Sequence, residues 1–251
     1  MMDYSIANDF ELPSLGKVYS TNVTPYAKLR SMTTMEEMKR LNHSERPYKA
    51  MAEIIDDCMV ENPGVSAYDM CLPDYQYMMH KLRIVTYGPL YKITSTCPYC
   101  GSANLHNLNL DEMSVTPFDE DTFKKYSEIT LPVSKHNIKI RLQTPRTMDD
   151  ITFKSKEERR KNPQSKVDAT FLFTLESLIE EIDGVRPESF RIRPFVQNLP
   201  MMDTNYILKS AQKLNQIFGL DMGLTHVCSV CGLDYNSSFR ATSEFFGPSI
   251  E

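Results

Sequence analysis

The chain has 251 residues, of which 41% are hydrophobic and 24% charged, and its 28 basic and 33 acidic side chains give a net charge of −5. This length allows one large domain or two small ones with their own hydrophobic core, which excludes a mini-protein that depends on cross-links. The acidic balance argues against a protein that coats nucleic-acid phosphates.

The sequence has no apolar run of the roughly 18 residues that a membrane-spanning helix needs. Residues 1–10 contain no basic stretch followed by an apolar one, so we expect no secretory signal. We therefore expect no membrane partner and a chain that folds in a reducing, cytosolic compartment.

The start of the chain predicts an extended arm followed by a helix. Prolines and glycines interrupt residues 1–32 too often for a helix, so we expect an arm with turns. Thr33 and Thr34 each precede a glutamate by three residues, which is the spacing of a capping box. This spacing predicts a helix over about 35–41.

Two further helices are expected after it. Pro47 and Pro73 suit first helical positions, and apolar residues follow each of them at three- and four-residue steps. Gly88 and the proline after it end the second of these helices. Segment 33–89 is therefore predicted to be helical.

From residue 90 the pattern changes to the alternation of strands. Residues 91–96 and 103–110 alternate on either side of a C-x-x-C pair, which predicts a hairpin with two cysteines in its turn. Residues 224–227 and 233–239 repeat the same arrangement around a second pair.

The residues between these hairpins predict a mixed segment. Residues 128–134 and 138–143 indicate another hairpin, and three helices are expected after it. These helices are predicted to run from an N-cap at Thr147 to about Lys161, from Asp168 to Ile182, and from an N-cap at Asp203 to Phe218.

Both cysteine pairs belong to C-x-x-C-G knuckles. The glycine permits a left-handed turn in which backbone amides point at the first sulfur and stabilise a thiolate. Four thiolates complete the tetrahedral shell of structural zinc, flanked by strands as in a zinc ribbon. The sequence predicts one structural Zn²⁺ per chain; an iron–sulfur cluster, redox dithiols and coincidence are the alternatives. The predicted metal ligands are Cys97, Cys100, Cys228 and Cys231.

The spacing between the knuckles is long, because 127 residues separate Cys100 from Cys228. Closing such a loop costs on the order of 4 kcal/mol beyond a constant, whereas zinc in finger peptides contributes roughly 10–16 kcal/mol. We expect the intervening residues to fold by themselves, so that zinc clamps early and late parts of an α+β protein. The predicted parts are an N-terminal arm (1–32), a helical segment (33–89), a zinc-ribbon platform (90–110 with 224–240), an inserted α+β subdomain (111–223) and a C-terminal tail (241–251).

Other cysteines and histidines receive structural interpretations. Cys58 and Cys71 lack partners at ligand spacing and are expected to be small buried hydrophobes. His226 is expected to be an exposed strand residue, because four thiolates already fill the shell. Residues 43–45, His-Ser-Glu, formally resemble half of a zinc-deaminase signature, but catalytic zinc needs an open position that four thiolates close. The sequence has no phosphate-binding loop or hydrolase motif either, so we predict no catalytic residues and no small-molecule substrate.

Charges are segregated along the chain. Segment 135–166 holds ten basic and four acidic residues, and segment 111–128 holds six acidic and two basic residues. Such blocks indicate solvated helix faces or a surface that matches a partner more often than a nucleic-acid footprint. A zinc-ribbon nucleic-acid-binding regulator is nevertheless the alternative function, for which salt-sensitive binding to DNA would be the evidence.

A series of landmarks along nearly the whole chain carries a family resemblance. They are Glu11–Tyr19, Met32–Glu37, Leu82–Gly88 leading into Cys97–Cys100, Asn198–Pro200, Gly219–Asp221 and Glu244–Pro248. In this order they resemble the baseplate hub and hub-assembly protein family of contractile-tailed bacteriophages. The resemblance implies a non-catalytic structural or assembly role, other tail and hub proteins as partners, and a location in the host cytoplasm during assembly or in the tail baseplate. The zinc prediction comes from the cysteines and not from the resemblance.

Overall fold

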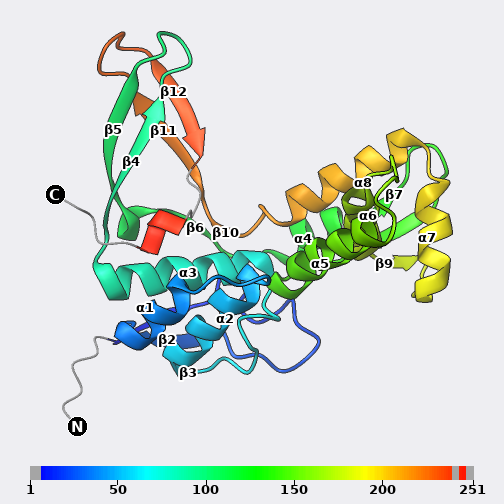
Figure 1. Ribbon diagram of the computed structural model, residues 1–251, viewed down its shortest axis with the longest axis horizontal. Coiled ribbons are helices and arrows are strands. Elements are labelled where there is room, and N and C mark those ends of the chain that lie inside the picture. The colour runs from blue at the N-terminus through cyan, green and yellow to red at the C-terminus, as the bar shows by residue number, and fades with distance from the viewer. Residues whose placement is uncertain (1–6, 239–242, 247–251) are drawn as a thin grey trace.

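The computed structural model describes residues 7–238 and 243–246 and has eight α-helices and several small antiparallel sheets within them (Figure 1). The predicted α+β class is confirmed. Its helices are α1 (Thr34–Leu41), α2 (Pro47–Cys58), α3 (Leu72–Tyr87), α4 (Glu120–Ser127), α5 (Pro145–Lys161), α6 (Ala169–Leu178), α7 (Ser189–Gln197) and α8 (Met201–Leu214), with 3₁₀ turns η1 (Leu110–Glu112) and η2 (Ser243–Phe246).

Within residues 7–238 and 243–246, the strands form five separate sheets of two or three members. They are β1 (Ala7–Glu11), β2 (Tyr26–Arg30), β3 (Met59–Glu61), β4 (Leu90–Thr96), β5 (Ala103–Asn109), β6 (Val115–Thr116), β7 (Glu128–Thr130), β8 (Asn137–Ile140), β9 (Ile179–Ile182), β10 (Gly219–Leu220), β11 (Gly223–Val227) and β12 (Asp234–Ser238). Among the described residues, no helix is both long and apolar enough to cross a membrane.

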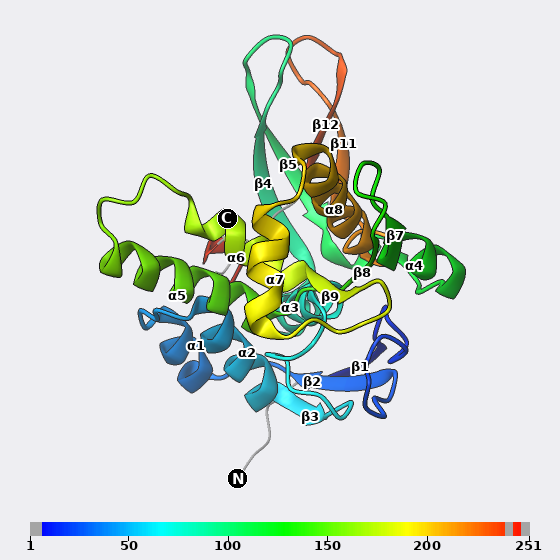
Figure 2. The ribbon, with the colours of Figure 1, turned by 90° about the vertical axis from the view of Figure 1, so that its right-hand side faces the viewer.

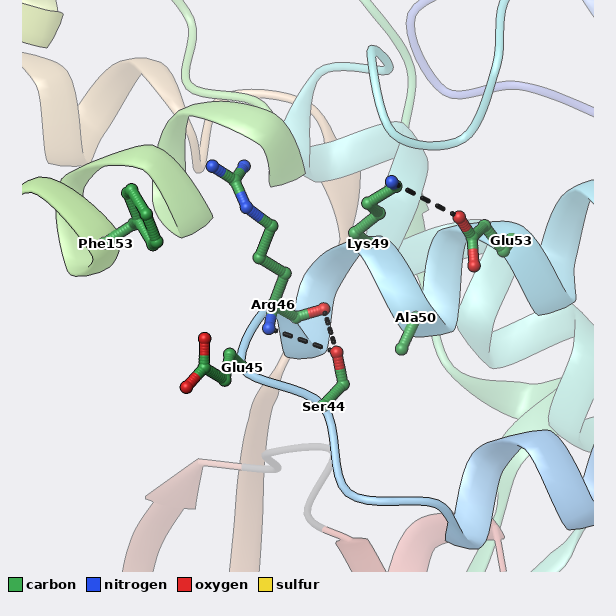
Figure 3. A pocket seen from close by; sticks show the side chains of 7 residues that line it. All are labelled: Ser44, Glu45, Arg46, Lys49, Ala50, Glu53 and Phe153. Carbon is green, nitrogen blue, oxygen red and sulfur yellow. Dashed lines mark hydrogen bonds and ion pairs between the residues drawn. The ribbon is translucent and has the colours of Figure 1, made fainter.

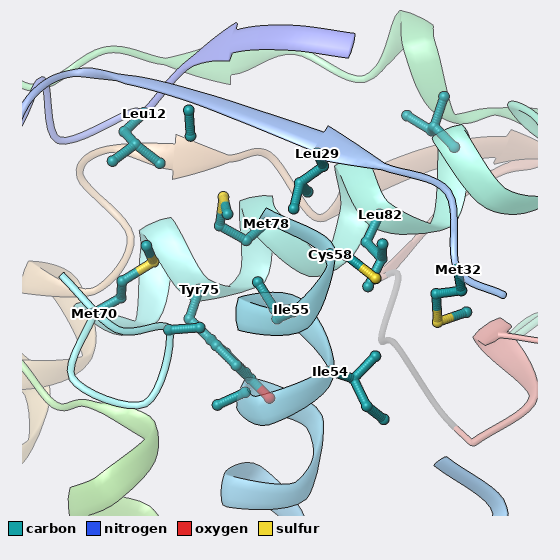
Figure 4. Close-up of a cluster of buried hydrophobic side chains, with 14 of the residues drawn as sticks. Leu12, Leu29, Met32, Ile54, Ile55, Cys58, Met70, Tyr75, Met78 and Leu82 are labelled. Atoms are coloured by element: carbon teal, nitrogen blue, oxygen red, sulfur yellow. The ribbon is translucent and has the colours of Figure 1, made fainter. Parts of the chain in front are cut away.

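The first core lies between α2, α3 and a small sheet. β1 pairs with β2 and β2 with β3, all antiparallel, so the predicted arm is extended but belongs to a sheet. Leu12, Leu29 and Met78 are fully buried in this core with side chains of α2 (Figure 4). Residues 1–6, at the start of the predicted arm, lie outside the described residues.

The capping box predicted at α1 is present. The N–H of Met35 donates to Thr33 Oγ1 at 3.2 Å, and the N–H of Thr33 donates to Glu36 Oε2 at 2.7 Å. Arg30 adds an ion pair with Glu36 at 2.8 Å, and this hydrogen bond lowers the pKa of the Glu36 carboxyl to about 2. The local pattern therefore placed α1 correctly, and the next two predicted helices begin at or beside their prolines as α2 and α3.

A second core is built from the β7–β8–β9 sheet and helices α6, α7 and α8. Its fully buried side chains include Leu131, Ile207 and Leu214. The predicted hairpin corresponds to β7 and β8, with Ile138 and Ile140 pointing into this core. The boundaries predicted for the inserted subdomain and the platform stay a prediction.

Three helix predictions in this region need correction. The prediction of one helix over 168–182 is wrong, because α6 ends at Leu178 and the next four residues pair with β8 as β9. Thr144 and not Thr147 caps α5, although Thr147 completes the box from the third helical position. Asp203 lies inside α8, where it accepts the N–H groups of residues 133 and 134 at 2.8 Å each, and α8 ends at Leu214 instead of residue 218.

Helix α5 links the two cores, because it contacts both α2 of the first core and α6 of the second. Asp149 of α5 is 2% exposed and accepts the backbone N–H groups of Tyr48 and Lys49 at 3.3 and 2.8 Å. These amides are in the first turn of α2, whose own N-cap residue provides no side-chain capping hydrogen bond. The Asp149 carboxylate of α5 thus caps α2 and complements its dipole.

His80 is buried at the point where α3 supports the turn η1. Its Nε2–H donates to the carbonyl oxygen of Leu110 at 2.9 Å, and burial lowers the pKa of the imidazole to about 4. The unfolded chain therefore binds a proton first as the pH falls. We therefore expect the free energy of unfolding to fall by about 3 kcal/mol between pH 6.5 and 4 because of His80 alone.

The pH dependence of urea unfolding tests this expectation. His80→Gln keeps a donor for the Leu110 carbonyl but does not titrate. Between pH 6.5 and 4, the free energy of unfolding of this variant should therefore fall by about 3 kcal/mol less than that of the unmodified chain. The same replacement at exposed His43 is the matched control, and its free energy of unfolding should depend on pH as strongly as that of the unmodified chain. Equal slopes for His80→Gln and the unmodified chain would contradict the assignment.

Candidate metal centre

Two hairpins stand side by side and project from the body of the molecule (Figure 1). The first is β4–β5 and the second is β11–β12, and together we call them the rod. In the first hairpin, β4 and β5 pair from Leu90 opposite Asn109 to Thr96 opposite Ala103. In the second, β11 and β12 pair from Gly223 opposite Ser238 to Val227 opposite Asp234. Each hairpin carries one knuckle at its turn, so the rod brings the two predicted cysteine pairs to the same end.

The knuckles have nearly identical backbones. In each, the N–H of the glycine donates to the carbonyl oxygen of the first cysteine, Cys97 or Cys228, at 3.0 Å. Gly101 and Gly232 have φ angles of 71° and 72°, in the left-handed region that glycine adopts without strain. The left-handed glycine that the C-x-x-C-G pattern predicts is therefore present in both knuckles.

The four cysteine sulfurs lie within 4.8 Å of one another. The Sγ atoms of Cys97 and Cys231 are 3.7 Å apart, and those of Cys100 and Cys228 are 3.6 Å apart. A disulfide would require about 2.05 Å. A tetrahedron with Zn–S bonds of about 2.3 Å has edges of about 3.8 Å, so the separations suit four ligands of one ion.

Hydrogen bonds to sulfur favour thiolates at two of the positions. The N–H of Cys231 points at Cys228 Sγ from 3.5 Å and Ser102 Oγ lies 3.2 Å from it; these contacts lower the pKa of the Cys228 thiol to about 5. The same hydroxyl lies 3.1 Å from Cys100 Sγ and lowers the pKa of that thiol as well.

Cys231 behaves in the opposite way. A backbone hydrogen bond from Leu233 lowers its pKa, but removal from water and the three neighbouring thiols outweigh this and raise it to about 12. A negative charge on Cys231 beside the Cys100 and Cys228 thiolates therefore needs a cation. The donor set is consequently suited to a soft divalent metal such as zinc.

Polar side chains next to the sulfurs tie the two knuckles together. Asn104 of β5 is 3% exposed, and its Nδ2 lies 3.7 Å from Cys228 Sγ. Its Oδ1 accepts the backbone N–H of Ser229 at 2.9 Å and the Ser229 hydroxyl at 2.7 Å. Neither Asn104 nor Ser102 was predicted from the sequence; the available signal was a pair of polar residues within three positions of Gly101, which could reach the sulfurs of the knuckle.

Further contacts hold the hairpins together below the cysteines. The hydroxyl of Tyr235 on β12 lies 2.6 Å from Ser95 Oγ on β4 and 3.1 Å from His106 Nε2 on β5. The His106 and His226 rings stack with centroids 3.8 Å apart. His226 is therefore half-buried rather than exposed as expected, and it does not belong to the cysteine cluster.

The remaining candidates lie elsewhere. Cys58 and Cys71 are both buried, as predicted, and burial raises the pKa of the Cys58 thiol to about 12. Ser44 and Glu45 line a pocket of about 320 Å³ at the start of α2, across from Phe153 of α5 (Figure 3). Arg46 in the same pocket stacks 4.9 Å over the Phe153 ring. The cysteine cluster includes neither His43 nor Glu45, so the deaminase-like pairing does not form.

Comparison with known proteins gives one result. The model of a family described as T4 bacteriophage base plate protein matches residues 6–247. No curated protein and no solved structure matches the chain significantly.

Proposed function

The chain belongs to the T4 bacteriophage base plate protein family, and from this premise we propose that it is a non-catalytic component of the baseplate hub or of hub assembly, stabilised by one structural zinc. Membership extends over nearly all of the chain and is the observation that carries the proposal. It supports a structural component of a phage baseplate, with other baseplate or tail proteins as partners. The hub assignment comes from the landmarks in the sequence.

Zinc is the metal that fits the cysteine cluster best. All four ligand positions come from Cys97, Cys100, Cys228 and Cys231, which leaves no open position for a substrate or an activated water. The ion would join two hairpins that are far apart in the chain. We therefore propose a structural role, in which the metal holds the rod rigid while the protein is in contact with its neighbours.

The nucleic-acid alternative receives little support from segment 135–166, which holds ten basic and four acidic residues. Within it, Lys139 lies 3.2 and 3.5 Å from the carboxylates of Glu181 and Glu180, and Arg146 lies 2.6 Å from that of Asp69. Part of the positive charge is thus balanced inside the chain. We therefore favour a protein partner over a nucleic-acid partner for this chain.

Affinity purification from phage-producing cells tests the function. A tagged chain should copurify with other baseplate proteins in a fixed ratio from the host cytoplasm. Mass spectrometry of purified virions then distinguishes the two forms of the proposal, because a structural subunit gives stoichiometric peptides and an assembly factor gives none. Absence of baseplate proteins from the purified material, together with salt-sensitive DNA binding, would instead support the regulator.

The metal is tested separately on the purified chain. We expect one zinc per chain by elemental analysis and a colourless protein, whereas an iron centre would absorb visible light. A protein that contains no metal after purification under reducing conditions, and takes up none from added Zn²⁺, would contradict the zinc proposal.

A further inference from the structure

Two exposed segments carry equal and opposite net charge. Residues 154–166, the second half of α5 and the loop after it, contain six basic and two acidic residues, a net charge of +4. Residues 111–128, from η1 through α4, contain six acidic and two basic residues, a net charge of −4. The six basic side chains of residues 154–166 and the six acidic side chains of residues 111–128 are all exposed. We call residues 154–166 the basic segment and residues 111–128 the acidic segment.

Ion pairing inside the chain balances little of this charge. Among the described residues, the ion pairs within the basic and acidic segments are Arg160–Glu157 at 4.0 Å and Lys124–Glu120 at 2.8 Å. By contrast, basic residues just before the basic segment have partners on other elements, as Arg146 has in Asp69. Within the described residues, the first half of α5 therefore forms ion pairs with other elements, whereas the second half does not.

Helix dipoles explain only some of these residues. Arg159, Arg160 and Lys161 occupy the last turn of α5, and Glu120 and Asp121 the first turn of α4, where such charges stabilise a helix. Lys154, Lys156 and Lys166 lie outside the last turn, as Asp111, Glu112 and Glu128 lie outside the first turn of α4. Asp111 and Glu112 lie in the short turn η1, where Asn109 Nδ2 donates to the Glu112 carboxylate at 2.7 Å. The other four residues have no such local explanation.

The two segments cannot meet within one molecule. Figure 2 shows α5 and the loop after it on one side and α4 on the opposite side. From Thr152 to Lys161, α5 has no buried residue, and Ser127 is the buried residue of α4, so both helices present their charges to solvent. Each segment also exposes an apolar side chain that an interface would cover, Val167 beside the basic segment at 74% and Val115 in the acidic segment at 38%.

We propose that the basic segment of one copy docks on the acidic segment of a second copy. Such a contact joins different surfaces of identical chains, so it leaves an unused segment at each end of the pair. Successive copies then close into a ring or extend into a filament. Because the contact rests on exposed charges, it is weak and sensitive to salt. The proposal concerns association of the chain with itself and does not depend on the baseplate function.

Charge reversal at each end tests the docking. One variant carries Lys154→Glu, Lys156→Glu and Lys166→Glu and so has two acidic ends; the other carries Glu112→Lys, Asp121→Lys and Glu128→Lys and has two basic ends. Sedimentation should show that the unmodified chain associates at about 50 mM salt and dissociates at about 500 mM. Each variant alone should associate at least ~10-fold more weakly, because like charges then face each other.

Mixing the two variants supplies the decisive measurement. An equimolar mixture should recover association close to that of the unmodified chain, because every acidic end then meets a basic end. Circular dichroism verifies that both variants are folded. The control for net charge carries Lys49→Glu, Lys209→Glu and Lys213→Glu, all exposed residues outside both segments, and should associate normally.

Several results would overturn the proposal. The unmodified chain could stay monomeric up to about 100 μM at low salt, which is too weak for this docking. The mixture could fail to associate, as expected if the contact joined like surfaces. The unmodified chain could also bind DNA while the triple lysine variant does not, with neither chain associating with itself; the basic segment would then be a nucleic-acid surface.

Discussion

Replacing Cys97 and Cys100 together with serine is expected to reduce bound zinc from one ion per chain to none and to unfold the rod. The rod has almost no hydrophobic core of its own, since the buried cluster at its tip consists of Cys97, Cys228 and Tyr235. Under the zinc proposal, the metal therefore supplies most of the stability of the rod. The free energy of opening the rod should fall by up to about 10 kcal/mol, the lower end of what zinc contributes to finger peptides.

Hydrogen exchange measures this loss locally. Amides of β4, β5, β11 and β12 should exchange rapidly in the variant, whereas amides of α3 and α8 should stay protected, because their cores are separate from the knuckles. Cys58→Ala with Cys71→Ala removes the same number of thiols and is the matched control, which should keep its zinc. Unchanged zinc content or unchanged protection of β4 and β5 in the Cys97/Cys100 variant would refute the clamp.

Asp74→Ala is expected to destabilise the folded chain by about 4 kcal/mol. The Asp74 carboxylate is fully buried at the start of α3. It accepts hydrogen bonds from the N–H and hydroxyl of Ser14 at 3.0 and 2.5 Å and from the hydroxyl of Tyr19 at 2.7 Å. Its removal leaves buried donors without an acceptor, and each such donor costs about 1–3 kcal/mol.

Urea unfolding at neutral pH measures the effect. Asp69→Ala is the matched control, because Asp69 also binds strongly, to Arg146 at 2.6 Å, but its side chain is 47% exposed. Exposed ion pairs contribute about 0–1 kcal/mol, so the control should lose no more than that. If both variants lost the same small amount, Asp74 would not be what fastens residues 14–19 to α3.

Features that depend on local sequence were predictable. The capping box at Thr33 and Glu36, the glycine turns of both knuckles and the strands beside them each involve residues close together in the chain. The meeting of the two knuckles was also predictable in principle, because a tetrahedral metal site needs four ligands and each pair supplies two. Zinc itself and the predicted domain boundaries stay proposals.

Features that depend on distant residues were not predictable. Asp203 has the residue type and spacing of an N-cap, but the amides that it binds belong to the β7–β8 loop, 69 and 70 residues away. Arg83 is fully buried, and its Nε donates to the carbonyl of Phe245, 162 residues away, at 2.7 Å. Residues 179–182 continue the apolar pattern of α6, but the free edge of β8 makes them a strand.

The separation of the two knuckles also sets an order of events during synthesis. A ribosome adds about 5–20 residues per second, so Cys228 is made about 6–25 s after Cys100, which precedes it by 127 intervening residues. During this delay the first hairpin has half of a ligand shell and no second hairpin to pack against. The helices and sheet between them have time to fold first, and the last residues to be made then complete the site. A chain that stops before Cys228 is left with an open dithiol, which distinguishes unfinished copies from finished ones.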